Sequence, residues 1–243
     1  MATSNRSKTY LFLLLILSST HLLVDLLHSL ISASYPILKK NYSLDFVQIG
    51  IISLTFQIAA ALLQPLIGMM TDRHAAPYSP VVGMMFTLSG LVCLAFAQSY
   101  ERILISVALI GIGSSIFHPE ATRMARYAAG RRQGLGQAIF QVGGQTGGAL
   151  GPVFAALIIV PWGVSSLSWV ASLAILAMIF LIWIGSKQRQ ISAEFSAMQE
   201  SRKIEMEGRV YAPVTIAIVL VILIFLMFTK NFYGESFRSF YTF

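Results

Sequence analysis

The chain alternates between long apolar runs and short polar segments, which is the pattern of a protein that crosses a membrane several times. Seven runs approach the length of about 20 apolar residues that a membrane-spanning helix needs. They cover roughly residues 10–34, 48–70, 80–98, 103–125, 135–160, 165–185 and 212–233. The connections between the first six runs are short, which is typical of helices packed as hairpins. We therefore predict an all-α membrane protein.

One connection is different from the others. Residues 186–211, "SKQRQISAEFSAMQESRKIEMEGRV" and its neighbours, carry charges of both signs and predict a solvated linker. The layout is then a six-helix bundle over residues 1–185, a cytoplasmic linker over 186–211, and one further helix within 212–243. Parallel six-helix halves are the plan of one large class of secondary transporters. We expect a truncated twelve-helix plan that lacks most of its C-terminal half; a complete seven-helix protein is the alternative.

Composition supports the membrane assignment and excludes several other classes. Hydrophobic residues make up 56% of the 243 positions and charged residues only 11%, whereas soluble domains are about one quarter charged. The net charge of +7 does not indicate nucleic-acid binding, because the basic residues fall between the apolar runs. A single cysteine excludes an intrachain disulfide and a CxxC metal motif. We expect no cofactor and no metal site.

The same basic residues predict the orientation. With the N-terminus inside, the inner segments hold twelve Lys and Arg residues and the outer segments hold five. Basic residues favour the cytoplasmic side of a membrane. We therefore expect a multi-pass protein of a bacterial inner membrane with a cytoplasmic N-terminus.

The first apolar run carries three ionisable residues, His21, Asp25 and His28. Spacings of four and three residues place them on one face of a helix. A lone Asp at the centre of a membrane helix costs about 2.5–3.5 kcal/mol on insertion scales, so such residues usually face a polar interior. Either a proton relay or substrate site, or a hydrogen-bonded packing cluster, explains the stripe, and we favour the first.

A second polar group stands in "FHPEAT" near the end of the fourth run, with His118, Pro119 and Glu120 side by side. Pro119 removes a helical hydrogen bond and favours a bend. Glu120 and Arg123 are three residues apart and are spaced to pair. We expect His118 and Glu120 to line an inward-opening path; the alternative is that Glu120 and Arg123 only mark the wet end of the helix.

The fifth run is rich in glycine and glutamine. Small residues repeated every four positions give a smooth helix face for close packing, and an amide stripe at the same spacing indicates a wet cavity or interhelical hydrogen bonds. The packing residues are Gly143, Gly147 and Gly151, followed by Pro152, and the amides include Gln141 and Gln145.

Two further motifs lie at the ends of other runs. "GMMTDR" contains Gly68, Asp72 and Arg73, and its carboxylate and guanidinium are suited to a gating ion pair in a tight loop. Lys230 in the last run lies at nearly the depth of Asp25 in the first. If the two halves are repeats, these two residues would face each other across a central cavity; otherwise Lys230 reaches toward the membrane surface.

These residues together resemble a known family. "GMMTDR" is similar to the signature between helices 2 and 3 of the major facilitator superfamily, although "HAAPYSP" replaces its glycine and basic cluster. "GGALGP" resembles the helix 5 signature of the superfamily's antiporters, with Ala155-Ala156 where a glycine pair normally follows. "THLLVDLLHS" and "GIGSSIFHPEA" are similar to the fosmidomycin resistance protein family, which implies export of a small phosphonate antibiotic.

The resemblance implies a proton-coupled efflux antiporter whose partners are a small-molecule substrate, protons and the lipid bilayer. In this interpretation the first-run residues exchange protons, and Arg123, Lys230 or a protonated histidine attracts an anionic substrate. A symporter for a small metabolite or sugar is the nearest alternative. An intramembrane metalloenzyme is a distant one, because the histidines and carboxylates are acceptable zinc ligands but no HExxH motif is present. An inactive truncated transporter is the last.

Overall fold

A computed structural model describes residues 9–73, 76–205 and 213–240. Every element among these described residues is helical, so the predicted all-α fold is confirmed. The chain divides into two compact units, residues Met1–Phe195 and Ser196–Phe243.

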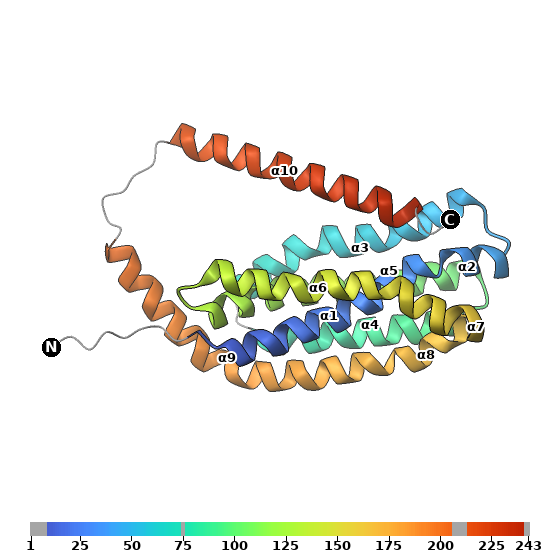
Figure 1. Cartoon of the computed structure of the whole chain (residues 1–243), viewed down its shortest axis with the longest axis horizontal. Helices are drawn as coiled ribbons and strands as arrows, with labels where there is room; N and C mark the ends of the chain where they lie inside the picture. Colours follow the sequence, from blue (N-terminus) through green and yellow to red (C-terminus); the bar gives the residue numbers. More distant parts are fainter. Residues whose placement is uncertain (1–8, 74–75, 206–212, 241–243) are drawn as a thin grey trace. The chain divides into compact units, whose positions relative to one another are not determined.

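The first unit is a bundle of long helices that lie side by side (Figure 1). Its helices are α1 (Leu11–Ala33), α2 (Tyr35–Asn41), α3 (Phe46–Arg73), α4 (Ser79–Ala95), α5 (Tyr100–Ala129), α6 (Gln133–Phe154), α7 (Val160–Trp162), α8 (Leu167–Val170) and the first part of α9 (Ser172–Glu205). A π-helical turn (Ala155–Ile159) joins α6 to α7, and a 3₁₀ turn (Val164–Ser166) precedes α8. The second unit contains the end of α9 and the helix α10 (Pro213–Phe240).

Six of the seven predicted spans are long and apolar enough to cross a membrane. The third predicted span, residues 80–98, is shorter than expected: the helix α4 has 17 residues, whereas a membrane span needs about 20. The helix ends at Ala95, and Ser99 caps the next helix by accepting a hydrogen bond from the backbone N–H of Arg102 at 3.4 Å. A short turn over residues 96–98 therefore separates α4 from α5.

Glycines bring α6 and α1 into backbone contact. The spacing in the sequence predicts a face for close packing, and the structure shows that its partner is α1. A methyl group on Gly143 would overlap the carbonyl oxygen of Ser18, and one on Gly147 would overlap that of Leu22. A methyl group on Gly151 would meet the Ser29 side chain. Only glycine permits this separation, so α6 holds α1 and its ionisable residues in a fixed register.

The helix α5 is the central support of the bundle. Its Gly111 lies against Phe56 and Ala59 of α3, and its Gly113 lies against the backbone of Gly83 in α4. Added methyl groups would lie within 3 Å of these neighbours, which is closer than van der Waals contact permits. The side chains of α5 are therefore placed between α1, α3 and α4.

The helix α9 continues beyond the predicted boundary at residue 185. Gln188, Ile191 and Phe195 are buried in the first unit. The Tyr127 and Phe195 rings are 5.1 Å apart, and Tyr10 Oη donates a hydrogen bond of 2.6 Å to Glu194. The expected solvated linker therefore starts as a packed helical extension. Its later residues 206–212 lie outside the described part of the chain.

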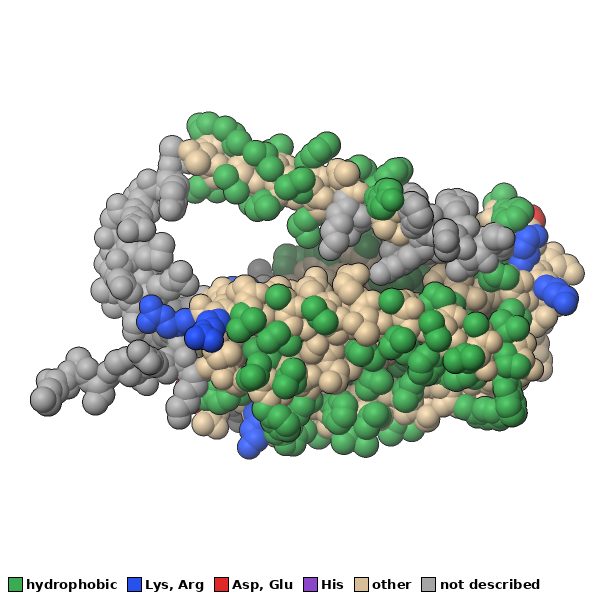
Figure 2. Space-filling view, viewed as in Figure 1, with side chains coloured by type: hydrophobic (Ala, Val, Ile, Leu, Met, Phe, Trp, Pro, Cys, Tyr) green, Lys and Arg blue, Asp and Glu red, His purple; other side chains and the backbone are tan. Residues whose placement is uncertain are grey.

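The surface of the bundle is that of a protein surrounded by lipid. Large side chains such as Phe12, Leu62 and Leu157 are more than half exposed. Figure 2 shows hydrophobic side chains over the long flank of the bundle and Lys and Arg side chains toward its ends. Because soluble proteins rarely expose apolar surface of this extent, the pattern supports a multi-pass membrane protein.

Candidate functional site

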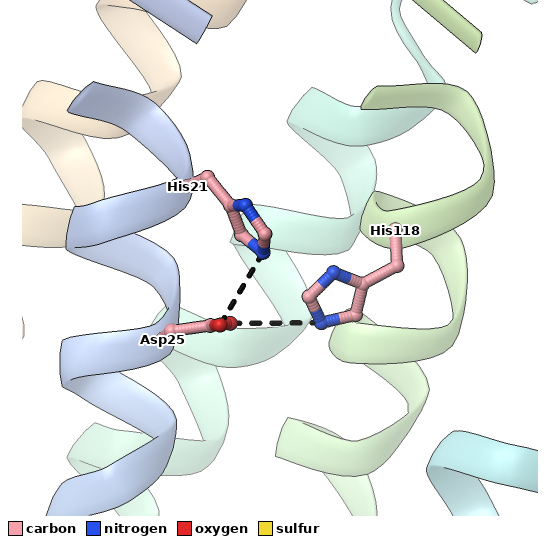
Figure 3. A group of neighbouring side chains, drawn as sticks. All are labelled: His21, Asp25 and His118. Atoms are coloured by element: carbon pink, nitrogen blue, oxygen red, sulfur yellow. Dashed lines mark ion pairs between the residues drawn. The ribbon is translucent and has the colours of Figure 1, made fainter. Parts of the chain in front are cut away.

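Three ionisable side chains from two helices meet inside the bundle. His21 and Asp25 of α1 and His118 of α5 point toward one another (Figure 3). Asp25 Oδ2 is 3.3 Å from His21 Nε2, and Asp25 Oδ1 is 3.7 Å from His118 Nε2. We call these three residues the His–Asp cluster. It joins the two polar groups that were noted separately in the sequence.

The backbone fixes the proton on one nitrogen of His21. Its Nδ1 lies 2.9 Å from the carbonyl oxygen of Phe140, and a carbonyl can only accept, so Nδ1 carries hydrogen. The His21 ring also stacks on the Phe140 ring with centroids 4.1 Å apart. In a neutral His21, the Nε2 atom that faces Asp25 then carries a lone pair and no hydrogen. The contact with Asp25 is attractive only when a second proton is present, either as imidazolium or as carboxylic acid.

His118 and His28 complete the surroundings of Asp25. The His118 ring lies edge-on to His21, with centroids 5.4 Å apart, and edge-on to His28 at 6.1 Å. The Nε2 atom of His28 is buried and has no hydrogen-bond partner among the described residues. Since a buried polar atom without a partner is costly, this nitrogen is an unusual feature in a helix bundle.

The cluster lies at mid-depth and is partly open. His21 and Asp25 flank the middle residue of α1, which runs from Leu11 to Ala33. The His21 side chain is 5% exposed, while the side chains of Asp25 and His118 are 26% and 25% exposed. Substrate and coupling-ion sites of secondary transporters are found at this depth. The partial exposure of Asp25 and His118 is therefore suited to exchange of a proton with their surroundings.

Gly144 of α6 forms one wall of the cluster. A methyl group at this position would come within 2.6 Å of His21 Nε2 and 2.7 Å of Asp25 Oδ2. Because residue 144 is glycine, no side chain of α6 separates His21 Nε2 from Asp25 Oδ2. Gly144 thus permits the close approach of α6 at the site, as Gly143 and Gly147 permit it at the helix contact.

Glu120 belongs to a second and separate ionic group, although it is only two residues from His118. It is fully buried. It accepts a hydrogen bond of 2.6 Å from Arg123 and another from the Gln188 amide of α9. Arg123 also donates to the carbonyl oxygen of Thr71 in α3 at 2.9 Å and to its hydroxyl at 3.1 Å. We call these four residues the Glu120 network, which ties α3, α5 and α9 together.

The structure thus divides the residues that the sequence proposed for one pathway. The expected Glu120–Arg123 pair forms, but it occupies the Glu120 network and not the His–Asp cluster. Gln141 and Gln145 lie on the exposed surface of α6.

The helix-packing residues occupy several places. Pro119 remains within α5, where a methyl group on Gly68 would lie 4.0 Å from its Cβ. Pro152 lies near the end of α6, just before the π-helical turn. The side chains of Asp72, Arg73 and Lys230 lie outside the described residues, so the proposed gate pair and the Asp25–Lys230 pair stay predictions.

Some important partners were not identified from the sequence. Thr71 and Gln188 hold the Glu120 network, and the Phe140 carbonyl fixes the proton of His21. Gln188 is separated from Glu120 by 68 residues, and the Phe140 contact is through backbone. No local pattern of spacing carries these contacts, because they depend on how α1, α5, α6 and α9 pack.

Comparisons with known proteins agree with this architecture. Residues 17–242 match the model of the Major Facilitator Superfamily. The chain is 44% identical over its whole length to the Fosmidomycin resistance protein of Escherichia coli (strain K12), of which it covers 59%. It is also 44% identical over 71% of its length to the Uncharacterized MFS-type transporter YfnC of Bacillus subtilis (strain 168), of which it covers 42%.

A more distant similarity is 24% identity to the Probable nitrate transporter NarT of Staphylococcus aureus (strain JH9), over 71% of this chain and 45% of that protein. The chain therefore spans less than two thirds of the length of each of these relatives. They are transporters or resistance proteins, and none is named as an enzyme.

Proposed function

Because the chain belongs to the major facilitator superfamily, and within it to the fosmidomycin resistance family, we propose that it is the N-terminal part of a proton-coupled antiporter. The exported compound is a small drug-like molecule of the kind for which the Escherichia coli relative is named. The superfamily consists of transporters, so the metalloenzyme alternative is set aside. We further propose residues 1–185 as the N-terminal bundle, with a missing C-terminal half, in a bacterial inner membrane.

The contact between His21 Nε2 and Asp25 Oδ2 is the observation that carries this proposal. One lone pair and one carboxylate oxygen lie 3.3 Å apart, with the other nitrogen of His21 already committed to Phe140. This arrangement accepts one proton and holds it between the two residues. When the proton leaves, a carboxylate and a lone pair repel each other inside the bundle. Protonation therefore changes the interaction between two neighbouring turns of α1.

His118 links this proton site to a different helix. Its Nε2 is 3.7 Å from the second oxygen of Asp25, which is longer than a hydrogen bond but close enough for electrostatic coupling. Protonated His118 attracts Asp25 across the α1–α5 interface. In the proposed cycle the cluster holds either the proton or the substrate, so that the binding of one opposes the binding of the other, which is the requirement for exchange.

The Glu120 network is the proposed fixed side of the gate. It joins the end of α3 and the middle of α9 to α5 through a fully buried carboxylate. Thr71 immediately precedes Asp72 and Arg73, so the network anchors the end of α3, to which we assign gating. The glycines of α6 keep that helix in close contact with α1, so the two helices move together in the proposed cycle.

Antibiotic susceptibility tests the proposal. The chain, and its longer form if the gene continues, are expressed in a drug-sensitive bacterium that is challenged with fosmidomycin and with unrelated antibiotics. We expect protection by the longer form and its loss in Asp25→Asn. Asp45→Asn is the matched control, because Asp45 is exposed and its Oδ1 caps α3 by accepting from the backbone of Gln48, a role that Asn also fills.

Two results would overturn the proposal. Absence of protection by either form, with both present in the membrane, removes the drug as substrate and favours uptake of a small metabolite by symport. Undiminished protection by Asp25→Asn removes the His–Asp cluster from the transport cycle.

A further inference from the structure

The atoms of the His–Asp cluster that face one another are all metal ligands by type. His21, Asp25 and His118 each offer a ligand atom, and these atoms lie within 4.8 Å of one another. The two shorter separations are 3.3 and 3.7 Å. Zinc bonds to nitrogen and oxygen are about 2.0–2.2 Å, which places tetrahedral ligands about 3.4 Å apart. The existing separations therefore need only small side-chain rotations to surround one ion.

The orientation of His21 is that of a metal-binding histidine. Ligating imidazoles usually donate their second ring nitrogen to a carbonyl or carboxylate, which fixes the tautomer and the ring direction. His21 Nδ1 meets the Phe140 carbonyl in this way, and stacking on the Phe140 ring holds the ring plane. Its Nε2 lone pair is thus aimed at Asp25 before any ion arrives.

Two further features lie at the cluster, within the part of the chain that the structure describes: a buried histidine nitrogen without a partner, and a carboxylate charge without a nearby basic residue. His28 lies one turn from Asp25, and its buried Nε2 has no hydrogen-bond partner among the described residues. With neutral histidines, the Asp25 carboxylate gives the group a charge of −1. The described basic residue nearest in sequence to His118 is Arg123, which is paired with Glu120. The 25–26% exposure of Asp25 and His118 gives an ion a route of entry.

We propose that His21, Asp25 and His118 form a binding site for one divalent transition-metal ion, whose remaining coordination position is open to water. Imidazole nitrogens with one carboxylate suit zinc, cobalt, nickel or copper and disfavour magnesium and calcium, which prefer oxygen ligands. The site is absent from sequence motifs because its ligands come from two helices. The inference stands apart from the proposed function, since metal binding requires only these side chains in place and no transport.

Cobalt absorption spectroscopy of the purified full chain tests the site. Co²⁺ replaces Zn²⁺ in such sites and its visible bands report a four-coordinate ligand field. The protein is purified with a tag that contains no histidine and is titrated with CoCl₂ in detergent. We expect saturation at one Co²⁺ per chain, and loss of the bands when excess Zn²⁺ is added. Mg²⁺ and Ca²⁺ leave the bands unchanged.

Variants assign the ligands. Asp25→Asn and His118→Gln each weaken Co²⁺ binding by at least about tenfold, since loss of even an outer-shell partner of a metal ligand costs about 10–100-fold. His74→Gln, which removes the remaining histidine of the sequence, and Asp45→Asn leave it unchanged. Asp25→Asn and His118→Gln must elute from size-exclusion chromatography as the wild type does, so that a folding defect is recognised.

His118→Cys separates a ligand from a structural residue. Cysteine can ligate as thiolate, so this variant retains Co²⁺ and gains a sulfur-to-cobalt charge-transfer band that the wild type lacks. Absence of saturable binding to the wild type overturns the proposal. Binding that survives both Asp25→Asn and His118→Gln, or a cysteine variant with the wild-type spectrum, overturns it as well.

Discussion

His118 and Glu120 are two residues apart on α5, and each belongs to a different ionic group. The carboxylate of the Glu120 network is fully buried and accepts hydrogen bonds from Arg123 and Gln188, although the Oε1 atom of Gln188 has no hydrogen-bond partner among the described residues. The His–Asp cluster is partly exposed, its two ion-pair contacts measure 3.3 and 3.7 Å, and the adjacent His28 has a buried nitrogen with no hydrogen-bond partner among the described residues.

The difference indicates different roles. A buried ionic group with its partners in place resists change, since removing one partner leaves an uncompensated charge. In a loosely connected group, the number of bound protons does not match the number of acceptor atoms. Such a group can change its protonation or its ligand at little structural cost. We therefore propose that the Glu120 network serves stability and that the His–Asp cluster serves exchange. Four substitutions test this contrast on one scale, the free energy of unfolding in detergent.

The largest loss is expected for Arg123→Met, which leaves the buried Glu120 carboxylate without its cation. Breaking such a pair costs about 3–5 kcal/mol. Thermal or denaturant unfolding followed by circular dichroism measures it. Glu101→Gln, at the exposed start of the same helix, is the control and changes stability by less than about 0.5 kcal/mol. Equal effects of the two changes would show that the Glu120 network contributes no more to the free energy of unfolding than an exposed surface residue does.

A smaller loss is expected for Gly144→Ala, because the added methyl group presses on His21 and Asp25. Overpacking of this kind costs about 1–3 kcal/mol. The same change also separates the two facing atoms, so it lowers drug protection as well as stability. Gly50→Ala in α3, where a methyl group meets nothing within 4 Å, is the control. A Gly144 variant that behaves like the Gly50 variant would contradict the tight α1–α6 contact.

A still smaller loss is expected for Tyr10→Phe. This change removes the hydrogen bond to Glu194 that joins the start of α1 to α9, which is worth about 0.5–1.5 kcal/mol. The same hydrogen bond, together with burial, raises the pKa of Tyr10 above its ordinary value. Ultraviolet titration of the tyrosine checks this shift: Glu194→Gln should lower the pKa of Tyr10 toward its ordinary value. An unchanged titration would exclude the contact.

The smallest change in stability is expected for Asp25→Asn. The amide has the same shape and can still donate to His21 Nε2, so the unfolding free energy changes by less than about 1 kcal/mol. Transport is nevertheless lost, because the amide cannot exchange a proton. A loss of several kcal/mol would place Asp25 with Glu120 as a structural residue and would contradict the contrast.

The sequence predicted the parts of this picture that depend on local spacing. The all-α membrane fold follows from the apolar runs, the close packing of α6 from Gly143, Gly147 and Gly151, although not the identity of its partner α1, and the Glu120–Arg123 pair from a three-residue interval. The family followed from the short motifs and is confirmed by the comparisons.

Other parts depend on contacts between distant segments. The meeting of His118 with Asp25 rather than with Glu120 is set by the direction of each side chain around α5, which residue order alone does not give. The burial of Gln188 was unexpected, because a charged stretch with both signs is typical of solvated segments. Only the packing of α9 against α5 shows that its first residues are part of the bundle.

The central claim is that Asp25 exchanges the proton that drives export. Inverted membrane vesicles that contain the protein, or its longer form, are energised to acidify their interior, and the proton gradient is followed with a pH-sensitive dye as fosmidomycin is added. We predict that the drug dissipates the gradient in wild-type and Asp45→Asn vesicles but not in Asp25→Asn vesicles, which acidify equally well. Drug accumulation without loss of the gradient in the wild type, or full dissipation by Asp25→Asn, would contradict this claim.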